Sequence, residues 1–208
     1  KMVLSITAVL IVLGTVYFAV AEWDNPATLG EMPLWQRPLN ALFQSVTLRT
    51  AGYATFDMGG LREGSAVMSI VLMLIGGSSG STAGGLKTVT VGILLLALRD
   101  GLRGRDQVVF RGRRIPGRKV LDAMTLALTV VLLFLSASML LSLVDRVPYV
   151  QAAFETASAM GTVGVTMGIT PNLSTPSALL VILLMFLGRV GILSFSIAFL
   201  TRGRGENK

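Results

Sequence analysis

The chain has 208 residues, of which 52% are hydrophobic and 14% charged, with a net charge of +7 and a mean hydropathy of +0.72. A soluble domain carries about 25% charged residues, so this composition indicates a membrane protein. Cysteine and histidine are absent, which excludes disulfides, thiolate metal sites, histidine-ligated zinc and Ser-His-Asp catalysis. No acid pair is expected at membrane depth either, and we predict that the chain is not an enzyme.

The first 53 residues predict one membrane span and one shorter helix. Residues 2–21 carry no charge, and 20 residues suffice for a helix to cross about 30 Å of hydrocarbon. Residues 37–46 are too few to span, but their apolar side chains recur at helical spacing. The polar, glycine-containing segment 47–53 is not expected to be regular helix. Because the chain begins at Lys1, without an initiator Met or a signal-peptide layout, we expect it to be a fragment of a longer protein.

Residues 65–98 are apolar at both ends, but the ten residues 76–85 interrupt the run, and five of them are glycine. Irregular backbone at membrane depth is tolerated only where protein or water satisfies its polar groups. We therefore expect a broken helix that faces a cavity. One alternative is close helix packing through small residues. Another is a phosphate-binding loop, which the spacing disfavours because one residue too many separates the glycines from Lys87.

The second half of the chain predicts the same elements again. Residues 120–144 form a second full span, and residues 148–160 form a short, half-apolar helix. A polar turn, 161–168, follows. The last span is expected over 176–200, beginning at a proline suited to a helix N-terminus and carrying Arg189 near its middle.

The order of span, short helix, glycine turn and span thus occurs twice, which is an internal repeat. Residues 40–45 align with 151–156, and Thr50 to Tyr53 align with Thr162 to Val165 if one residue is inserted between helix and turn. The copies run in the same sense, unlike the inverted repeats of many secondary transporters. We predict four parts: a first pore repeat over 1–98, a basic loop over 99–119, a second pore repeat over 120–200 and a tail over 201–208.

Eight basic and two acidic residues lie between Arg99 and Lys119, and the tail adds further basic residues. Because this segment lies between apolar spans, it indicates a cytoplasmic loop that obeys the positive-inside rule rather than a nucleic-acid site. We therefore expect a multi-pass protein of the cell (inner) membrane, with the loop 99–119 and the C-terminus in the cytoplasm.

The two glycine turns are candidate selectivity filters. A bare cation in a pore needs oxygens that replace its water shell, and potassium channels supply backbone carbonyls from Thr-Val-Gly-Tyr-Gly after a short helix. Thr162-Val163-Gly164 matches the start of that pattern, and the first turn is a weaker copy of it. The plain alternative is a glycine-rich extracellular turn. The candidate residues, whose carbonyls would bind K⁺, are Thr50, Ala51, Gly52, Tyr53, Thr162, Val163, Gly164 and Val165.

These motifs carry a family resemblance. Segments 47–53, 76–87, 154–168 and 188–191 resemble the Trk/Ktr/HKT superfamily of potassium transporters, and most closely a bacterial Ktr- or Trk-type pore subunit. The resemblance implies an all-α membrane protein with two tandem helix–pore-helix–filter–helix repeats of the potassium-channel type. By this resemblance, the two repeats correspond to the third and fourth of the four repeats in the family's proteins, which form their C-terminal half. It implies potassium uptake, with Gly52 and Gly164 as the filter glycines.

The resemblance also implies that the glycine-serine segment gates the pore from beneath the filter. An arginine at a helix centre costs about 2.5–3.5 kcal/mol, so Arg189 needs a partner. We expect it to point into the pore and bond to the loop 76–85; the alternative is a buried arginine that holds helices together. The candidate gate residues are Gly76, Gly77, Ser78, Ser79, Gly80, Ser81, Thr82, Gly84, Gly85 and Arg189.

The expected ligand is the potassium ion, with sodium as a second candidate and no organic cofactor. The resemblance implies a homodimer that rests on a cytoplasmic ring of nucleotide-binding RCK subunits. The basic loop and tail would face that ring, and anionic lipid is the alternative partner for the same charges. Membrane lipid is an expected partner and nucleic acid is not. Two other functions stay open: a secondary cation transporter with discontinuous helices, and a non-conducting structural membrane subunit.

Overall fold

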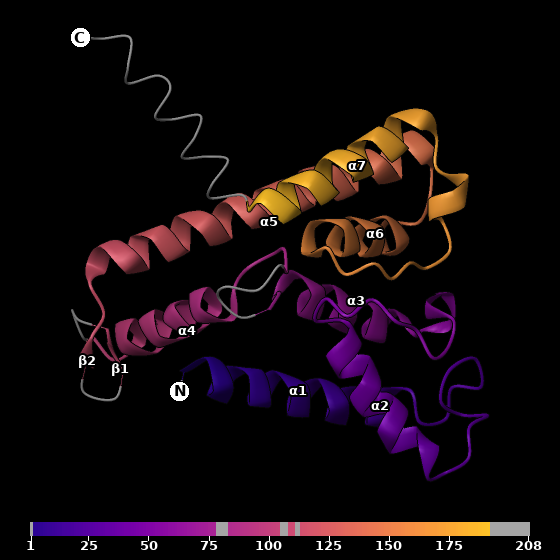
Figure 1. The fold of residues 1–208 in the computed structure, drawn as a ribbon, viewed down its shortest axis with the longest axis horizontal. Coiled ribbons are helices and arrows are strands. Elements are labelled where there is room, and N and C mark those ends of the chain that lie inside the picture. The colour runs from indigo at the N-terminus through magenta and orange to yellow at the C-terminus, as the bar shows by residue number, and fades with distance from the viewer. Residues whose placement is uncertain (1, 78–82, 105–107, 111–112, 192–208) are drawn as a thin grey trace.

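The computed structural model describes residues 2–77, 83–104, 108–110 and 113–191, and these are mostly helical. Figure 1 shows α1 to α4 on one side of the molecule and α5 to α7 on the other. The two groups meet where α3 packs against α6 and where α4 packs against α5. The bounds of the helices are α1 Met2–Ala21, α2 Gln36–Thr47, α3 Glu63–Leu74, α4 Thr88–Leu102, α5 Gly117–Asp145, α6 Tyr149–Gly161 and α7 Thr175–Val190.

The helices expected from the sequence are present. The expected span 2–21 is α1, and the two expected short helices are α2 and α6, each within one residue of its predicted start or end. The expected span 120–144 is α5, which begins three residues earlier, at Gly117. The last expected span is α7 up to Val190, and the rest of it lies outside the described residues.

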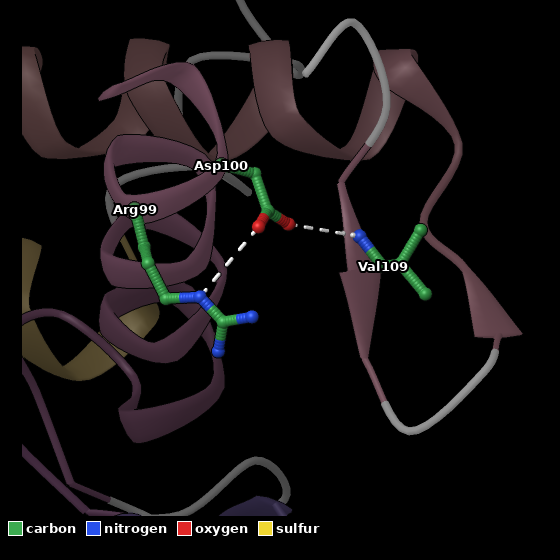
Figure 2. A network of polar contacts seen from close by, with 3 residues as sticks. All are labelled: Arg99, Asp100 and Val109. Atoms are coloured by element: carbon green, nitrogen blue, oxygen red, sulfur yellow. Dashed lines mark hydrogen bonds and ion pairs between the residues drawn. The ribbon is translucent and has the colours of Figure 1, made fainter. Parts of the chain in front are cut away.

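The basic segment 99–119 contains more structure than the expected loop. α4 continues to Leu102, and the antiparallel strands β1 (Val109–Phe110) and β2 (Arg113–Arg114) form a small hairpin before α5. The carboxylate of Asp100 is buried and accepts a hydrogen bond from the backbone N–H of Val109 at 3.2 Å. Figure 2 shows this contact together with the ion pair from Arg99 Nε to Asp100, at 3.6 Å. One acidic side chain therefore fastens the hairpin to the end of α4.

The apolar run 65–98 is divided between α3 and α4. α3 ends at Leu74 and α4 begins at Thr88. Leu86 N–H donates to the carbonyl of Leu74 at 2.8 Å, and Thr88 N–H donates to the carbonyl of Gly77 at 3.2 Å. These bonds hold the two ends of the intervening segment together. Residues 78–82 of the expected gate lie outside the described residues.

The interior and the surface differ in the way expected for a membrane protein. α6 is buried along residues 152–161, so it lies in the middle of the bundle, and two of its largest buried side chains are Phe154 and Met160. α1 and α5 are both long and apolar enough to cross a membrane, and both expose many apolar side chains. A helix that presents apolar side chains outward is stable where its surroundings are lipid.

Candidate functional site

The turn after α2 is held by the last residue of that helix. The carbonyl of Thr47 accepts hydrogen bonds from the N–H groups of Ala51 and Gly52, at 3.0 and 3.3 Å. The Thr47 hydroxyl accepts from Tyr53 N–H at 2.9 Å and donates to the Tyr53 carbonyl at 2.6 Å. Thr50 and Gly52 both have positive φ, +76° and +80°. Hydrogen bonds to Thr47 thus hold both ends of a turn in which two residues adopt the left-handed backbone conformation.

The turn after α6 is held in a closely similar way. Ser158 accepts at its carbonyl from Val163 N–H (2.9 Å) and at its hydroxyl from Gly164 N–H (3.2 Å). Thr162 and Gly164 have φ of +54° and +96°. A β-branched residue at positive φ is unusual, so tertiary contacts must hold Thr162 in this conformation. Positive φ occurs at the first and third residues of both predicted turns.

The structure brings these two turns together. A Cβ built on Gly52 would lie 2.2 Å from the carbonyl oxygen of Val163, far inside van der Waals contact. A Cβ built on Gly164 would lie 3.9 Å from the Cα of Gly52. The two backbones therefore face each other without intervening side chains. Among the described residues, no three His, Cys, Asp or Glu side chains gather where they could hold a metal ion.

Gly84, which lies between α3 and α4, contacts the start of the second turn. Its N–H donates to the carbonyl of Gly161 at 3.1 Å and to the hydroxyl of Thr162 at 3.0 Å. A Cβ on Gly84 would lie 2.3 Å from the carbonyl oxygen of Met160, so only glycine fits this close approach. The glycine-serine segment and the second turn are thus hydrogen-bonded neighbours.

α7 approaches the same point from the other side. A Cβ built on Gly188 would also lie 2.3 Å from the carbonyl oxygen of Met160, and 3.2 Å from Cγ2 of Thr162. Arg189 is the next residue and is exposed in this structure. Arg189 therefore directly follows the residue of α7 that packs against Met160 and Thr162. The expected bond from Arg189 to the loop 76–85 stays a prediction.

A buried acid supports the second turn from its far end. Glu155 in α6 is 5% exposed, and its carboxylate accepts from Met167 N–H at 3.1 Å and from the Thr170 hydroxyl at 2.8 Å. It also accepts from the hydroxyl of Thr166. The corresponding residue of α2 is Gln44, which is fully buried and donates to Met58 Sδ at 3.3 Å. Both short helices therefore place a buried polar side chain beneath the segment that follows each turn.

A second buried acid organises the segment after α1. The carboxylate of Glu22 accepts from Asn25 Nδ2 at 2.5 Å, from the Thr28 hydroxyl at 2.7 Å and from Arg62 N–H at 3.1 Å. Burial by itself would raise the pKa of Glu22, but these hydrogen bonds outweigh it and hold the pKa below its ordinary value of 4.5. Glu22 therefore serves the fold of this segment.

Sequence reasoning missed the hydroxyl groups of Thr47 and Ser158. The signal was available, because the alignment of residues 40–45 with 151–156 places Thr47 and Ser158 at the same position of the two short helices. Arg49, which follows α2, reaches the first helix: its guanidinium donates to the hydroxyl of Thr7 in α1 at 3.5 Å.

Comparison with known proteins decides the family. The sequence model of TrkH, described as a cation transport protein, matches residues 1–205. The chain belongs to the TrkH family. Members of this family are transporters and not enzymes, and this chain is a membrane protein.

Two curated relatives support the same assignment. The chain is 36% identical over 199 residues to "Ktr system potassium uptake protein B" of Bacillus subtilis, covering 96% of this chain and 45% of that protein. It is 41% identical over 206 residues to "Potassium/sodium uptake protein NtpJ" of Enterococcus hirae, covering 97% of this chain and 46% of that protein. The chain therefore spans about half the length of these relatives.

A solved structure shares the TrkH-family fold. The crystal structure of the potassium transporter TrkH from Vibrio parahaemolyticus superposes with a TM-score of 0.71, at 20% sequence identity. The match covers 95% of this chain and 43% of that chain. The mostly helical architecture of Figure 1 is thus that of half of a known membrane transporter.

Proposed function

We propose that the chain contributes part of a potassium-selective pore and that its two glycine turns are the filter. The observation that carries this proposal is the close approach of Gly52 to the carbonyl oxygen of Val163. Two strands of backbone that face each other at positive-φ glycines can direct carbonyl oxygens toward one ion, which replaces its water shell. The names of the relatives, two potassium uptake proteins, support potassium as the ion.

The short helices support this role electrostatically. α2 ends at Thr47 and α6 at Gly161, directly before the two turns. The C-terminal end of a helix carries about half a negative charge, which stabilises a cation nearby. The filter residues are then 50–53 in the first pore repeat and 162–165 in the second, with Thr47 and Ser158 as the side chains that hold them.

The glycine-serine segment 76–85 is the proposed gate. Its support is the bond from Gly84 to Thr162, which joins the segment to the first residue of the second proposed filter turn. Small residues and the interruption of the helix between α3 and α4 would let this segment move. Arg189 would add a positive charge that opposes cations beneath the filter. In this interpretation the run from α3 to α4 is a broken inner helix.

The remaining assembly is also proposed. Two turns surround an ion on two sides only, so the other two sides would come from the part of the protein that corresponds to the rest of the relatives' length. The whole transporter would be a homodimer in the inner membrane, with the segment 99–119 and the C-terminus in the cytoplasm. These basic segments would face a ring of RCK-type regulatory subunits.

Sodium is the second candidate ion, and one observation favours it. The relative from Enterococcus hirae is named for both potassium and sodium uptake, and it is 41% identical over 206 residues. Either ion would use the same backbone oxygens, so the residue assignments above do not change.

The test is uptake of potassium by the full-length protein in cells that lack their own uptake systems. Gly52→Ser and Gly164→Ser would each add a side chain at positive φ in the filter. Under the proposal, wild type restores growth at low potassium, and the variants lose this rescue or begin to admit sodium. Rescue by both variants with unchanged ion preference would contradict the filter assignment. No rescue by a well-inserted wild-type protein would favour a non-conducting structural subunit.

A further inference from the structure

A groove lies between the small hairpin and the first turns of α5, far from the two turns of the filter. It has a volume of about 440 Å³ and is lined by the apolar side chains Val108, Ile115, Leu121 and Met124, with Arg114 as the charged residue among its lining. A second groove, of about 240 Å³, shares Arg114 and Ile115 and extends toward α4. Arg114, at the junction between β2 and α5, thus lines two adjoining grooves whose other lining residues are mostly apolar.

The larger groove continues into an apolar stripe on α5. Leu121 and Met124 are 63% and 55% exposed, and further exposed apolar residues follow at intervals of three or four. At 1.5 Å per residue, the stripe from Leu121 to Met139 is about 27 Å long, close to the thickness of a hydrocarbon core. The members of this stripe are Leu121, Met124, Leu128, Val131, Leu135 and Met139. A long apolar chain that entered the groove could continue along the helix.

The polar end of the groove is positively charged. Among the described side chains of this segment, the exposed basic ones are Arg99, Arg103, Arg114, Arg118 and Lys119. Of the acids in the described part of this segment and the first turns of α5, Asp100 is buried and already bonded to Val109 N–H, and Asp122 is exposed. The surface at this end of α5 therefore attracts an anion.

The wall of the groove is held in place before any ligand arrives. Asp100 binds the N–H of Val109 (Figure 2), and Ile115 N–H donates to the carbonyl of Val108 at 2.9 Å. Val109 is in register with Arg114, so the same bonds fix the backbone that carries the arginine. A preorganised site loses less conformational entropy on binding.

We propose that this groove binds one anionic phospholipid, with its phosphate at Arg114 and an acyl chain along Leu121 and Met124. The charge is complementary to a phosphate, and the apolar floor runs into the membrane-facing stripe of α5, which suits a lipid better than a soluble protein. The proposal rests on the membrane location of the chain and does not depend on the ion that it transports.

The test is retention of lipid by the full-length protein, with dioleoyl phosphatidylglycerol and dioleoyl phosphatidylcholine as probes and native mass spectrometry as the readout. Wild type is expected to retain one phosphatidylglycerol per chain and to retain phosphatidylcholine much less. Arg114→Gln should weaken retention of phosphatidylglycerol about fivefold, the factor that corresponds to about 1 kcal/mol per basic residue near a membrane surface. Arg146→Gln, at the opposite end of α5, is the matched control and should change nothing.

A second pair of variants tests the place itself. A Cβ on Gly117, another residue that lines the groove, would meet no atom within 4 Å, so a longer side chain fits there. Gly117→Glu adds a negative charge beside the proposed phosphate and should abolish retention, while Gly117→Gln, of the same shape, should keep most of it. Equal retention by the Glu and Gln variants, or equal retention of the two lipids by wild type, would overturn the proposal. Equal retention by the Glu and Gln variants would indicate that the groove is covered by protein, such as a regulatory subunit or another part of the chain.

Discussion

The backbone N–H of Gly84 donates a hydrogen bond to the hydroxyl of Thr162 at 3.0 Å, between residues 78 positions apart in the sequence. Thr162 opens the second turn, and Gly84 belongs to the proposed gate. Both residues are also constrained: Thr162 by its positive φ and Gly84 by its contact with the Met160 carbonyl. This bond links the proposed gate directly to the proposed filter.

Removing that link should loosen the gate. Thr162→Val keeps the β-branched shape but loses the oxygen that accepts the bond. One hydrogen bond contributes about 1 kcal/mol, so uptake of Rb⁺ by the full-length protein in its resting state should rise about fivefold. Thr129→Val, which removes a hydroxyl that donates to the Thr125 carbonyl within α5, is the control and should behave as wild type. Resting uptake that stays at the wild-type level in well-inserted Thr162→Val would disprove the link.

The two glycines of the proposed filter, Gly52 and Gly164, should differ in their tolerance of alanine. Both have positive φ, which disfavours an L side chain by about 1–2 kcal/mol, but only Gly52 would also clash, since its Cβ would lie 2.2 Å from Val163 O. Gly52→Ala should therefore abolish Rb⁺ uptake, and Gly164→Ala should only reduce it. Gly104→Ala shares the positive φ but meets no atom within 4 Å, so it should leave uptake unchanged. The reverse order of severity between the two filter variants would contradict this geometry.

Ser158 should matter for ion preference more than for folding. Its hydroxyl accepts from Gly164 N–H, so Ser158→Ala leaves that N–H without this partner and frees the turn to change shape. We expect the preference for K⁺ over Na⁺ to fall about fivefold in uptake competition, with little change in the amount of protein in the membrane. The control is Ser136→Ala, whose hydroxyl bonds to its own helix on the exposed face of α5. Loss of expression instead of selectivity would assign Ser158 to the fold alone.

Glu155 should tolerate an amide but not truncation. Three groups donate to its carboxylate, and the equivalent position of α2 carries glutamine. Glu155→Gln keeps an acceptor oxygen and should retain most Rb⁺ uptake. Glu155→Ala removes this acceptor from the Met167 N–H and from the hydroxyls of Thr166 and Thr170. A hydrogen bond to a charged group contributes about 1.5–3 kcal/mol, so this variant should lower the thermal stability of the purified protein as well as uptake. Equal effects of the Gln and Ala variants would show that the negative charge itself is required.

Glu22 should make stability depend on pH. Its pKa is held below 4.5 in the folded protein, so the ionised form contributes stability that is fully present above the unfolded value and lost as pH falls through the folded one. Thermal unfolding between pH 7 and pH 3.5 should show this loss below about pH 4.5, and Glu22→Gln should flatten the profile. Glu31→Gln, at an exposed acid, is the control. An acid-side slope that persists in Glu22→Gln would assign the loss of stability to other carboxylates.

The sequence predicted the helices well because apolar length and helical spacing are local properties. α1 has the expected bounds, and α2 and α6 lie where short apolar segments alternate with polar turns. The hairpin before α5 was not predicted, because it depends on Asp100 reaching Val109 and on strands of two residues each, which carry no periodic signal. Length and periodicity therefore sufficed for the spans and failed for the segment between them.

For the site, the sequence by itself determined which glycines can adopt the positive φ that the two turns require. The glycines at 52 and 164, and their place after two similar short helices, were evident from spacing alone. Only the tertiary structure decided that Gly52 lies against Val163, that Gly84 bonds Thr162 and that Thr47 and Ser158 hold the turns. Some of these contacts join residues that are distant in the chain, and others depend on the rotamer that one side chain adopts. Tertiary packing determines both, whereas the backbone angles allowed to glycine are a property of the residue itself.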